Sequence, residues 1–233
     1  TFGDVGIYSA SSIKTLDTFG GGILVTDDDV LTAKLRLYLR GLAPPNRRVL
    51  FFKILINLIR NFATNRLIFN FLTLPVIRLM SFLTPNSVMK QTGERSDAMI
   101  QSLPAEWFCS YSSFQAAIGL ELLSRVSETD AARIDNAEKI KQRVKKINFP
   151  KGVPNGENVY WQLLAYFDRP VSIQKKLHKL KVDTASTSLM KISNLPAYPV
   201  QGYTPNADRL YTNSLFIPAH PNLSDDDIEY IIV

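Results

Sequence analysis

The chain has 233 residues, of which 45% are hydrophobic, and this is enough for one sizeable domain or two small ones. Its single cysteine, Cys109, excludes a disulfide within the chain and fits a reducing compartment. The formal net charge is +6, yet ten basic residues fall in one segment without Asp or Glu, from Val30 to Gly93. This uneven distribution does not indicate the broad basic surface that nucleic-acid binding needs.

The first segment of interest is a connection between two strand-like runs. Asp4–Ser9 mixes β-branched and aromatic residues, and Ile23–Thr26 is apolar, as a buried strand would be. Between them lie Lys14, several hydroxyl residues and the glycine triplet Gly20–Gly22. Hydroxyls and glycines let the chain approach an anionic group, and a lysine there is either an ion-pair partner, an amine nucleophile or a solvated surface residue.

A resemblance favours the nucleophile. The stretch SASSIKTLDTFGGGILVTDDDVLTAKLRLYLRG resembles the lysine segment of the DegT/DnrJ/EryC1/StrS sugar aminotransferases, with a serine five residues before the lysine and a glycine pair seven and eight residues after it. The resemblance implies that Lys14 binds pyridoxal 5'-phosphate (PLP) covalently and carries a proton, and that Ser9 binds the cofactor phosphate. Phe19-Gly20 stands where the family usually has Gly-Glu.

The segment 47–83 combines apolar residues with isolated cations. Its longest run without a charge, Leu67–Ile77, has 11 residues, whereas about 20 are needed to span a bilayer. Cations at Lys53, Arg60 and Arg66 recur at about two helical turns, which is typical of helices lying in a membrane interface. Helices that pack on the domain or on a second subunit would show the same pattern. Compared with the family, residues 42–103 resemble an insertion.

The next segment is helical by its spacing. Phe114, Ile118, Leu122 and Val126 form an apolar stripe, which continues in a second helix after a kink predicted near 128–130. FQAAIGLELLSR is again similar to the family. Phe108 and Ser110, however, stand where the family commonly has an Asn-x-Arg that reaches the cofactor phosphate of the partner subunit. The basic residues of the second helix are interpreted as a solvated face; they are Lys139, Lys141, Arg143, Lys145 and Lys146.

The last third alternates strands and helices. Strands are predicted in 159–167, 182–186 and 214–218, and helices in 172–180, 206–212 and 225–232. Two capping boxes are predicted, from Ser224 with Asp227 and from Thr26 with Asp29. The tail PNADRLYTNSLFIPAHPNLSDDDIEYII is similar to the closing segment of the family.

The ordered set of matches implies an α/β fold, the PLP-dependent transferase fold type I. The expected domains are the end of the large PLP-binding domain (1–105, with the insertion at about 42–103), a linking helix region (106–149) and a small α/β domain (150–233). The chain then corresponds to the C-terminal part of a family protein. The N-terminal half would supply the aromatic residue and the aspartate that contact the PLP ring, so the sequence leaves open whether this chain alone is active.

The resemblance implies amino transfer, usually from glutamate, to a keto group of a nucleotide-linked sugar in polysaccharide or glycan synthesis, by a homodimer in the cytoplasm. Two alternatives stay open at this point. The chain is either an inactive fragment or paralogue that serves as a binding or assembly module, or a component docked at the inner membrane face through 47–83. No metal site is expected, because His178 and His220 lie far apart and have no cysteine cluster nearby.

Overall fold

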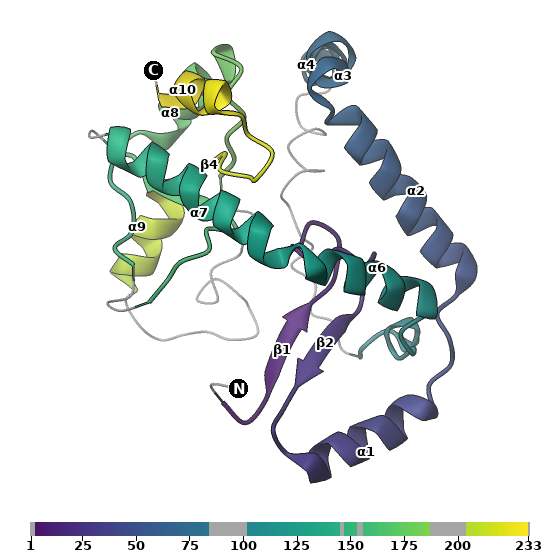
Figure 1. Ribbon diagram of the computed structural model, residues 1–233. Helices are drawn as coiled ribbons and strands as arrows, with labels where there is room; N and C mark the ends of the chain where they lie inside the picture. Colours follow the sequence, from purple (N-terminus) through teal and green to yellow (C-terminus); the bar gives the residue numbers. More distant parts are fainter. Residues whose placement is uncertain (1–2, 84–101, 145–146, 153–155, 187–203, 233) are drawn as a thin grey trace. The chain divides into compact units, whose positions relative to one another are not determined.

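The computed structural model describes residues 3–83, 102–144, 147–152, 156–186 and 204–232 (Figure 1). These residues belong to two compact units that divide between Val126 and Ser127. The first unit contains 3–83 and 102–126, and the second contains the described residues from 127 onward. The domain boundaries expected at residues 105 and 149 remain predictions.

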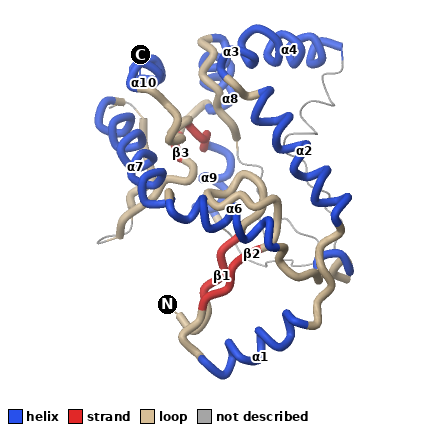
Figure 2. Tube along the Cα trace, turned by 45° about the vertical axis from the view of Figure 1, so that its right-hand side comes forward, coloured by secondary structure: helices blue, strands red, loops and turns tan. Residues whose placement is uncertain are grey.

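The first unit is built on a two-stranded antiparallel sheet. Strand β1 (Gly6–Ser9) pairs with β2 (Gly22–Val25) so that Gly6 faces Val25 and Ser9 faces Gly22 (Figure 2). Both strands lie within the runs predicted for them, to within a residue at β2. The expectation that the second run is buried was wrong, because Ile23, Leu24 and Val25 each keep about 40% of their surface exposed. A two-stranded ribbon leaves its faces open unless another layer covers them.

Helices make up most of the rest of the first unit. In chain order they are α1 (Asp29–Arg40), α2 (Arg47–Ala63), α3 (Arg66–Ile68), the π-helix η1 (Phe69–Thr73), α4 (Leu74–Leu83), the 3₁₀-helix η2 (Ala105–Trp107) and α6 (Ser113–Ser124). The helices predicted in 47–83 are therefore present.

The start of α1 differs from the prediction. Its N-cap is Asp28, whose carboxylate accepts a hydrogen bond from the backbone N–H of Leu31 at 2.9 Å. Thr26 does not pair with Asp29 in a capping box; its hydroxyl instead donates to the carbonyl of Asp4 at 2.7 Å. The aspartate nearest to the free N–H groups is the better cap, since it satisfies them with a charged acceptor.

The second unit packs helices on a second antiparallel pair. Its elements are α7 (Val126–Arg143), β3 (Leu163–Tyr166), α8 (Pro170–Lys179), α9 (Pro205–Asn213), β4 (Ser214–Ile217) and α10 (Asp225–Ile232). Strands β3 and β4 pair with Leu163 opposite Ile217. The buried core lies between this pair, α7 and α10, and consists of Ala137, Ile140, Leu163, Ala165, Ile217, Ala219 and Ile228. The break between α6 and α7 falls at Arg125, a few residues before the predicted kink.

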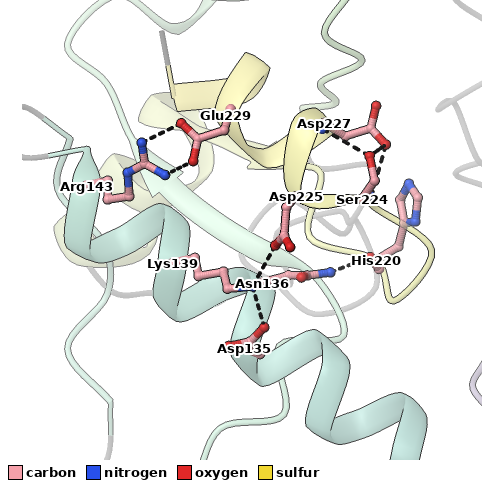
Figure 3. A network of polar contacts seen from close by, with 9 residues as sticks. All are labelled: Asp135, Asn136, Lys139, Arg143, His220, Ser224, Asp225, Asp227 and Glu229. Atoms are coloured by element: carbon pink, nitrogen blue, oxygen red, sulfur yellow. Dashed lines mark hydrogen bonds and ion pairs between the residues drawn. The ribbon is translucent and has the colours of Figure 1, made fainter.

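Polar contacts join α7 to the C-terminal helix α10 (Figure 3). Arg143 forms an ion pair with the carboxylate of Glu229. Lys139 Nζ lies 2.8 Å from Asp225 Oδ1 and 2.9 Å from Asp135 Oδ2. Lys139 and Arg143 keep 39% and 47% of their side-chain surface exposed, which agrees with the predicted solvated face, but they also bind carboxylates of a helix 86 residues further along the chain. The predicted capping box at Ser224 and Asp227 is present, with bonds of 3.0 and 3.2 Å.

These ion pairs make stability depend on pH. The hydrogen bond from Arg143 holds the pKa of Glu229 below its ordinary value, and Lys139 does the same to the pKa of Asp225. A carboxyl group whose pKa is lower in the folded state stabilises the fold above its unfolded pKa, and this contribution is lost as the pH falls through the folded pKa. The free energy of unfolding should therefore decrease as the pH is lowered below about 4, where the Asp and Glu side chains of the unfolded chain take up protons.

Urea unfolding at a series of pH values tests this expectation. In Lys139→Gln/Arg143→Gln the decline below about pH 4 should be shallower than in the unmodified chain, because both carboxyl groups regain ordinary pKa values. Lys175→Gln/Lys176→Gln removes the same charge from exposed positions of α8 and serves as the control. Equal slopes in the three proteins would contradict the assignment.

Candidate functional site

The connection between β1 and β2 folds back on its own first residue. Ala10, which is fully buried, accepts hydrogen bonds at its carbonyl from the backbone N–H groups of Thr18 (3.0 Å) and Gly20 (3.3 Å), and its own N–H donates to Gly21 (3.0 Å). These bonds close residues 10–21 into a loop at the end of the strand pair, which we call the Lys14 loop.

Of the two predicted site residues, Ser9 directly precedes the Lys14 loop and Lys14 lies within it. Ser9 ends β1, and its hydroxyl oxygen lies 2.9 Å from that of Ser11. The backbone N–H of Lys14 donates to the carbonyl of Ser11 at 3.2 Å, so that a tight turn separates Ser11 from the lysine. The Lys14 side chain is half-buried, whereas Ser9 is exposed. One lysine amine and three serine hydroxyls thus come from six consecutive residues, 9–14.

Asp17 supports the backbone on both sides of this turn. Its carboxylate accepts hydrogen bonds from the backbone N–H groups of Ile13 (3.3 Å) and Phe19 (3.0 Å). Ile13 and Phe19 are the residues of the loop other than glycine that have positive φ, at 70° and 65°. Such a conformation costs of order 1–3 kcal/mol for a residue with a side chain. The carboxylate therefore stabilises both strained positions, one of which directly precedes Lys14.

Helix α2 contributes a further donor to the same carboxylate. Asn57 of α2 donates its side-chain N–H to Asp17 Oδ2 at 2.7 Å. With 5% of its surface exposed, Asn57 is the buried residue of α2, a helix that the structure describes throughout. Lys53, one turn earlier, reaches the loop as well, since its Nζ lies 3.3 Å from the point where a Cβ on Gly20 would be.

Helix α6 and Tyr111, which lies just before it, also hold the Lys14 loop. Thr18, with 1% exposed, bonds through its hydroxyl to the carbonyls of Ala10 and Gly20 and to the Tyr111 hydroxyl. Gln115 of α6 donates to the carbonyl of Thr18 at 3.0 Å. These contacts bridge 93 and 97 residues of sequence, and they fix the loop against α6.

The glycines serve this packing. Gly20 and Gly21 have φ of 134° and 85°, which favour glycine, and a Cβ on Gly21 would lie 2.7 Å from the ring of Tyr111. Phe19, in place of the family's usual glycine, stacks on Phe114 of α6 with ring centroids 6.4 Å apart. Backbone conformation and close packing therefore explain why glycine stands at positions 20 and 21.

Phe108 and Ser110, which depart from the family pattern, have other contacts here. Ser110 donates to the carbonyl of Ala43 through its backbone N–H (2.8 Å) and through its hydroxyl (3.3 Å), and Phe108 is exposed. Among the residues that the structure describes, no group of three or more His, Cys, Asp or Glu could hold a metal ion.

Sequence reasoning missed the residues that hold the loop. Asp17 and Thr18 were not singled out from the other polar residues of the connection, although Asp17 is the acidic residue between Lys14 and the glycines. Gln115 had a recognisable signal, because it stands three residues after Ser112 and forms a capping box with it. Asn57 had a signal too, as an amide in a helix whose neighbouring positions are apolar.

The Asn57 contact gives a direct stability test. Asn57→Ala should lower the free energy of unfolding by about 1–3 kcal/mol, because the Asp17 carboxylate loses a buried donor. Asn61→Ala makes the same change at an exposed position of the same helix and should stay within about 0.5 kcal/mol. Urea unfolding measures both variants. If the two lose the same stability, Asn57 does not support the loop.

The C-terminal part of the chain matches a family model. The model describes the DegT/DnrJ/EryC1/StrS aminotransferase family and covers residues 109–233, a range that does not include the Lys14 loop. No curated protein matches the chain.

Solved structures of this family share the fold. The aminotransferase TlmJ from Streptoalloteichus hindustanus is 23% identical, with a TM-score of 0.63 over 100% of this chain and 51% of its own. A DegT DnrJ EryC1 StrS aminotransferase from Brucella abortus is 18% identical, with a TM-score of 0.64 over 99% of this chain and 49% of its own. E. coli GDP-4-keto-6-deoxy-D-mannose-3-dehydratase with bound hydrated PLP is 18% identical, with a TM-score of 0.63 over 100% of this chain and 54% of its own.

The chain therefore spans about half the length of the structures that it matches. The expected α/β class and fold type I are confirmed, in a chain that is mostly helical. The cofactor expectation, PLP, agrees with the family and with the PLP bound in the E. coli structure. The family model covers more than half of the chain's residues, so the chain belongs to the DegT/DnrJ/EryC1/StrS aminotransferase family.

Proposed function

We propose that the chain is the C-terminal part of a PLP-dependent aminotransferase that acts on nucleotide-linked keto sugars, with Lys14 as its catalytic residue. The observation that carries this proposal is the placement of Lys14. In a chain that belongs to a family of aminotransferases, it lies in a loop held by Asp17 on one side and by α6 on the other. A solvated lysine would need no such support.

The residues at the loop fit the cofactor by their chemistry. The amine of Lys14 suits the aldehyde of PLP, and the paired hydroxyls of Ser9 and Ser11, 2.9 Å apart, suit its phosphate. When bound, PLP supplies an electron sink for the carbon that gains or loses the amino group. Ser9 and Lys14 are the proposed cofactor-binding residues.

Lys14 would act twice through the same atom. Its Nζ is first the nucleophile that holds the cofactor, and after release by the donor amine it is the base that moves a proton at the substrate carbon. Both roles need the amine to stay in place when it is not bonded. The left-handed residue Ile13 and its bond to Asp17 fix the backbone from which this side chain extends.

The substrate class is supported by what related structures act on. The E. coli neighbour is named for GDP-4-keto-6-deoxy-D-mannose, a nucleotide-linked keto sugar, and PseC from Helicobacter pylori is an aminotransferase of pseudoaminic acid biosynthesis. The proposal extends to glutamate as amino donor, to a homodimer and to a role in polysaccharide synthesis. A cytoplasmic location, at the inner membrane face, is supported by the lone cysteine and by the basic apolar segment 47–83.

An inactive binding or assembly module is the less favoured alternative, because the family and the neighbouring structures are enzymes. The chain covers about half of those structures, so we assign residues 1–105 to the end of the large domain, 106–149 to a linking region and 150–233 to the small domain. The rest of the large domain would then complete the site around Lys14.

Trapping of the cofactor tests the role of Lys14. After PLP is added to the chain and reduced with borohydride, intact mass should show one stable adduct, and peptide mapping should place it on Lys14. Lys14→Ala should lose the adduct. Lys34→Ala, which removes an exposed lysine of α1, should keep it. Equal labelling of Lys14 and Lys34 would contradict the proposal, and a single adduct would justify a screen of nucleotide sugars with glutamate.

A further inference from the structure

Helix α2 exposes an apolar surface that nothing among the described residues covers. Six large apolar side chains of this one helix have about 60% of their surface exposed: Phe51, Phe52, Ile56, Leu58, Ile59 and Phe62. Apolar side chains that are exposed singly are common, but a continuous surface of this size usually marks a binding site.

The helix has two distinct sides. At 3.6 residues per turn, Leu50, Ile54 and Asn57 share the face that packs on the first unit, and they are less exposed than their neighbours. The six exposed apolar residues project about 100° or more away from Asn57, at about 100° per residue, and they form the outward side. The orientation of α2 is therefore set by its contact with Asp17, and the apolar side is left facing outward.

Cations border this apolar side. Arg60 lies on one flank, next to Ile56, and Arg47 lies on the other flank, next to Leu58, whereas Lys53 projects beside Asn57 and its amine reaches Gly20 of the Lys14 loop. Long basic side chains in such positions cover apolar surface with their methylene stems and present their charges at its edge. The segment from Val30 to Gly93 contains neither Asp nor Glu, and Asp17 meets α2 on its inner side, at Asn57.

The helices after α2 continue the same surface chemistry. In Figure 1, α3 and α4 follow at the end of α2, and Leu67, Phe71 and Leu79 are exposed, Phe71 by 81%. Thr73 donates its hydroxyl to the carbonyl of Ala63 at 2.8 Å, which fastens this group of helices to the end of α2. None of the described helices is both long and apolar enough to cross a membrane.

We propose that the outward side of α2, together with η1 and α4, docks on the surface of an anionic lipid bilayer. Apolar side chains enter the interface, and Arg47 and Arg60, on its two flanks, contact the head groups. Charge complementarity selects this partner, because a bilayer offers apolar depth and negative charge at the same boundary. The surface is separate from the reaction at Lys14, so the proposal can hold or fail whatever Lys14 does.

Vesicle cosedimentation of the whole chain, without PLP or substrate, tests this proposal. The chain should bind vesicles that contain phosphatidylglycerol, bind phosphatidylcholine vesicles more weakly, and be released by high salt. Arg47→Gln/Arg60→Gln should reduce the partition constant about 30-fold at low salt, from about 1 kcal/mol per basic residue at an anionic surface. Phe51→Gln/Leu58→Gln should reduce it at least about tenfold.

Two controls match these variants. Lys175→Gln/Lys176→Gln and Val171→Gln change exposed cations and an exposed apolar residue of α8, and they should bind as the unmodified chain does. Binding that ignores lipid charge, or that falls equally in the control variants, overturns the proposal. It is also overturned if vesicles do not bind while Phe51→Gln/Leu58→Gln abolishes self-association in analytical ultracentrifugation, because a second copy of the chain then covers α2.

Discussion

One carboxylate holds the candidate site together. Asp17 accepts hydrogen bonds from the backbone of Ile13 and Phe19 and from the side chain of Asn57. Two of these donors belong to residues in the left-handed region, a conformation that a chain with side chains adopts only when its surroundings stabilise it. The bonds to a charged acceptor are of the stronger kind. The path of the chain on both sides of Lys14 thus depends on a residue that itself has no place in the proposed chemistry.

Helix α2 is part of this arrangement. Asn57 comes from α2, within the segment that the family resemblance sets apart, yet it is the buried residue of its helix and donates to Asp17. The same helix turns its apolar side away from the loop. Helix α2 therefore has two sides with different roles, one that supports the Lys14 loop and one that faces outward for the proposed contact with lipid.

Much of the fold could be predicted where the signal is local. The capping box of Ser224 and Asp227 is encoded by four consecutive residues. The structure has both this capping box and the helix that follows it, as expected. The pairing of Arg143 with Glu229 could not be predicted, because the two residues are 86 positions apart and a basic helix face looks the same with or without a partner. The same holds for Thr18 and Gln115, and for the exposure of Ile23, which depends on whether another layer covers the strand. Lys14 was proposed as a site residue from its spacing in a family motif, whereas the support of its loop by Asp17 could be seen only in the structure.

The contact between Ser110 and Ala43 has a consequence for how such a chain varies over time. The backbone N–H of Ser110 meets the carbonyl of Ala43 at 2.8 Å, so the segment 44–109, whose described residues belong to the first unit, starts and ends at this point. The entropy lost on closing a loop grows only slowly with its length, which makes the number of residues beyond that point nearly neutral for stability. The expected insertion at 42–103 could therefore be lengthened and given a surface of its own while β1, β2 and α6 kept their places. What limits its later removal is Asn57, since a shortened chain would leave the Asp17 carboxylate without its shortest hydrogen bond.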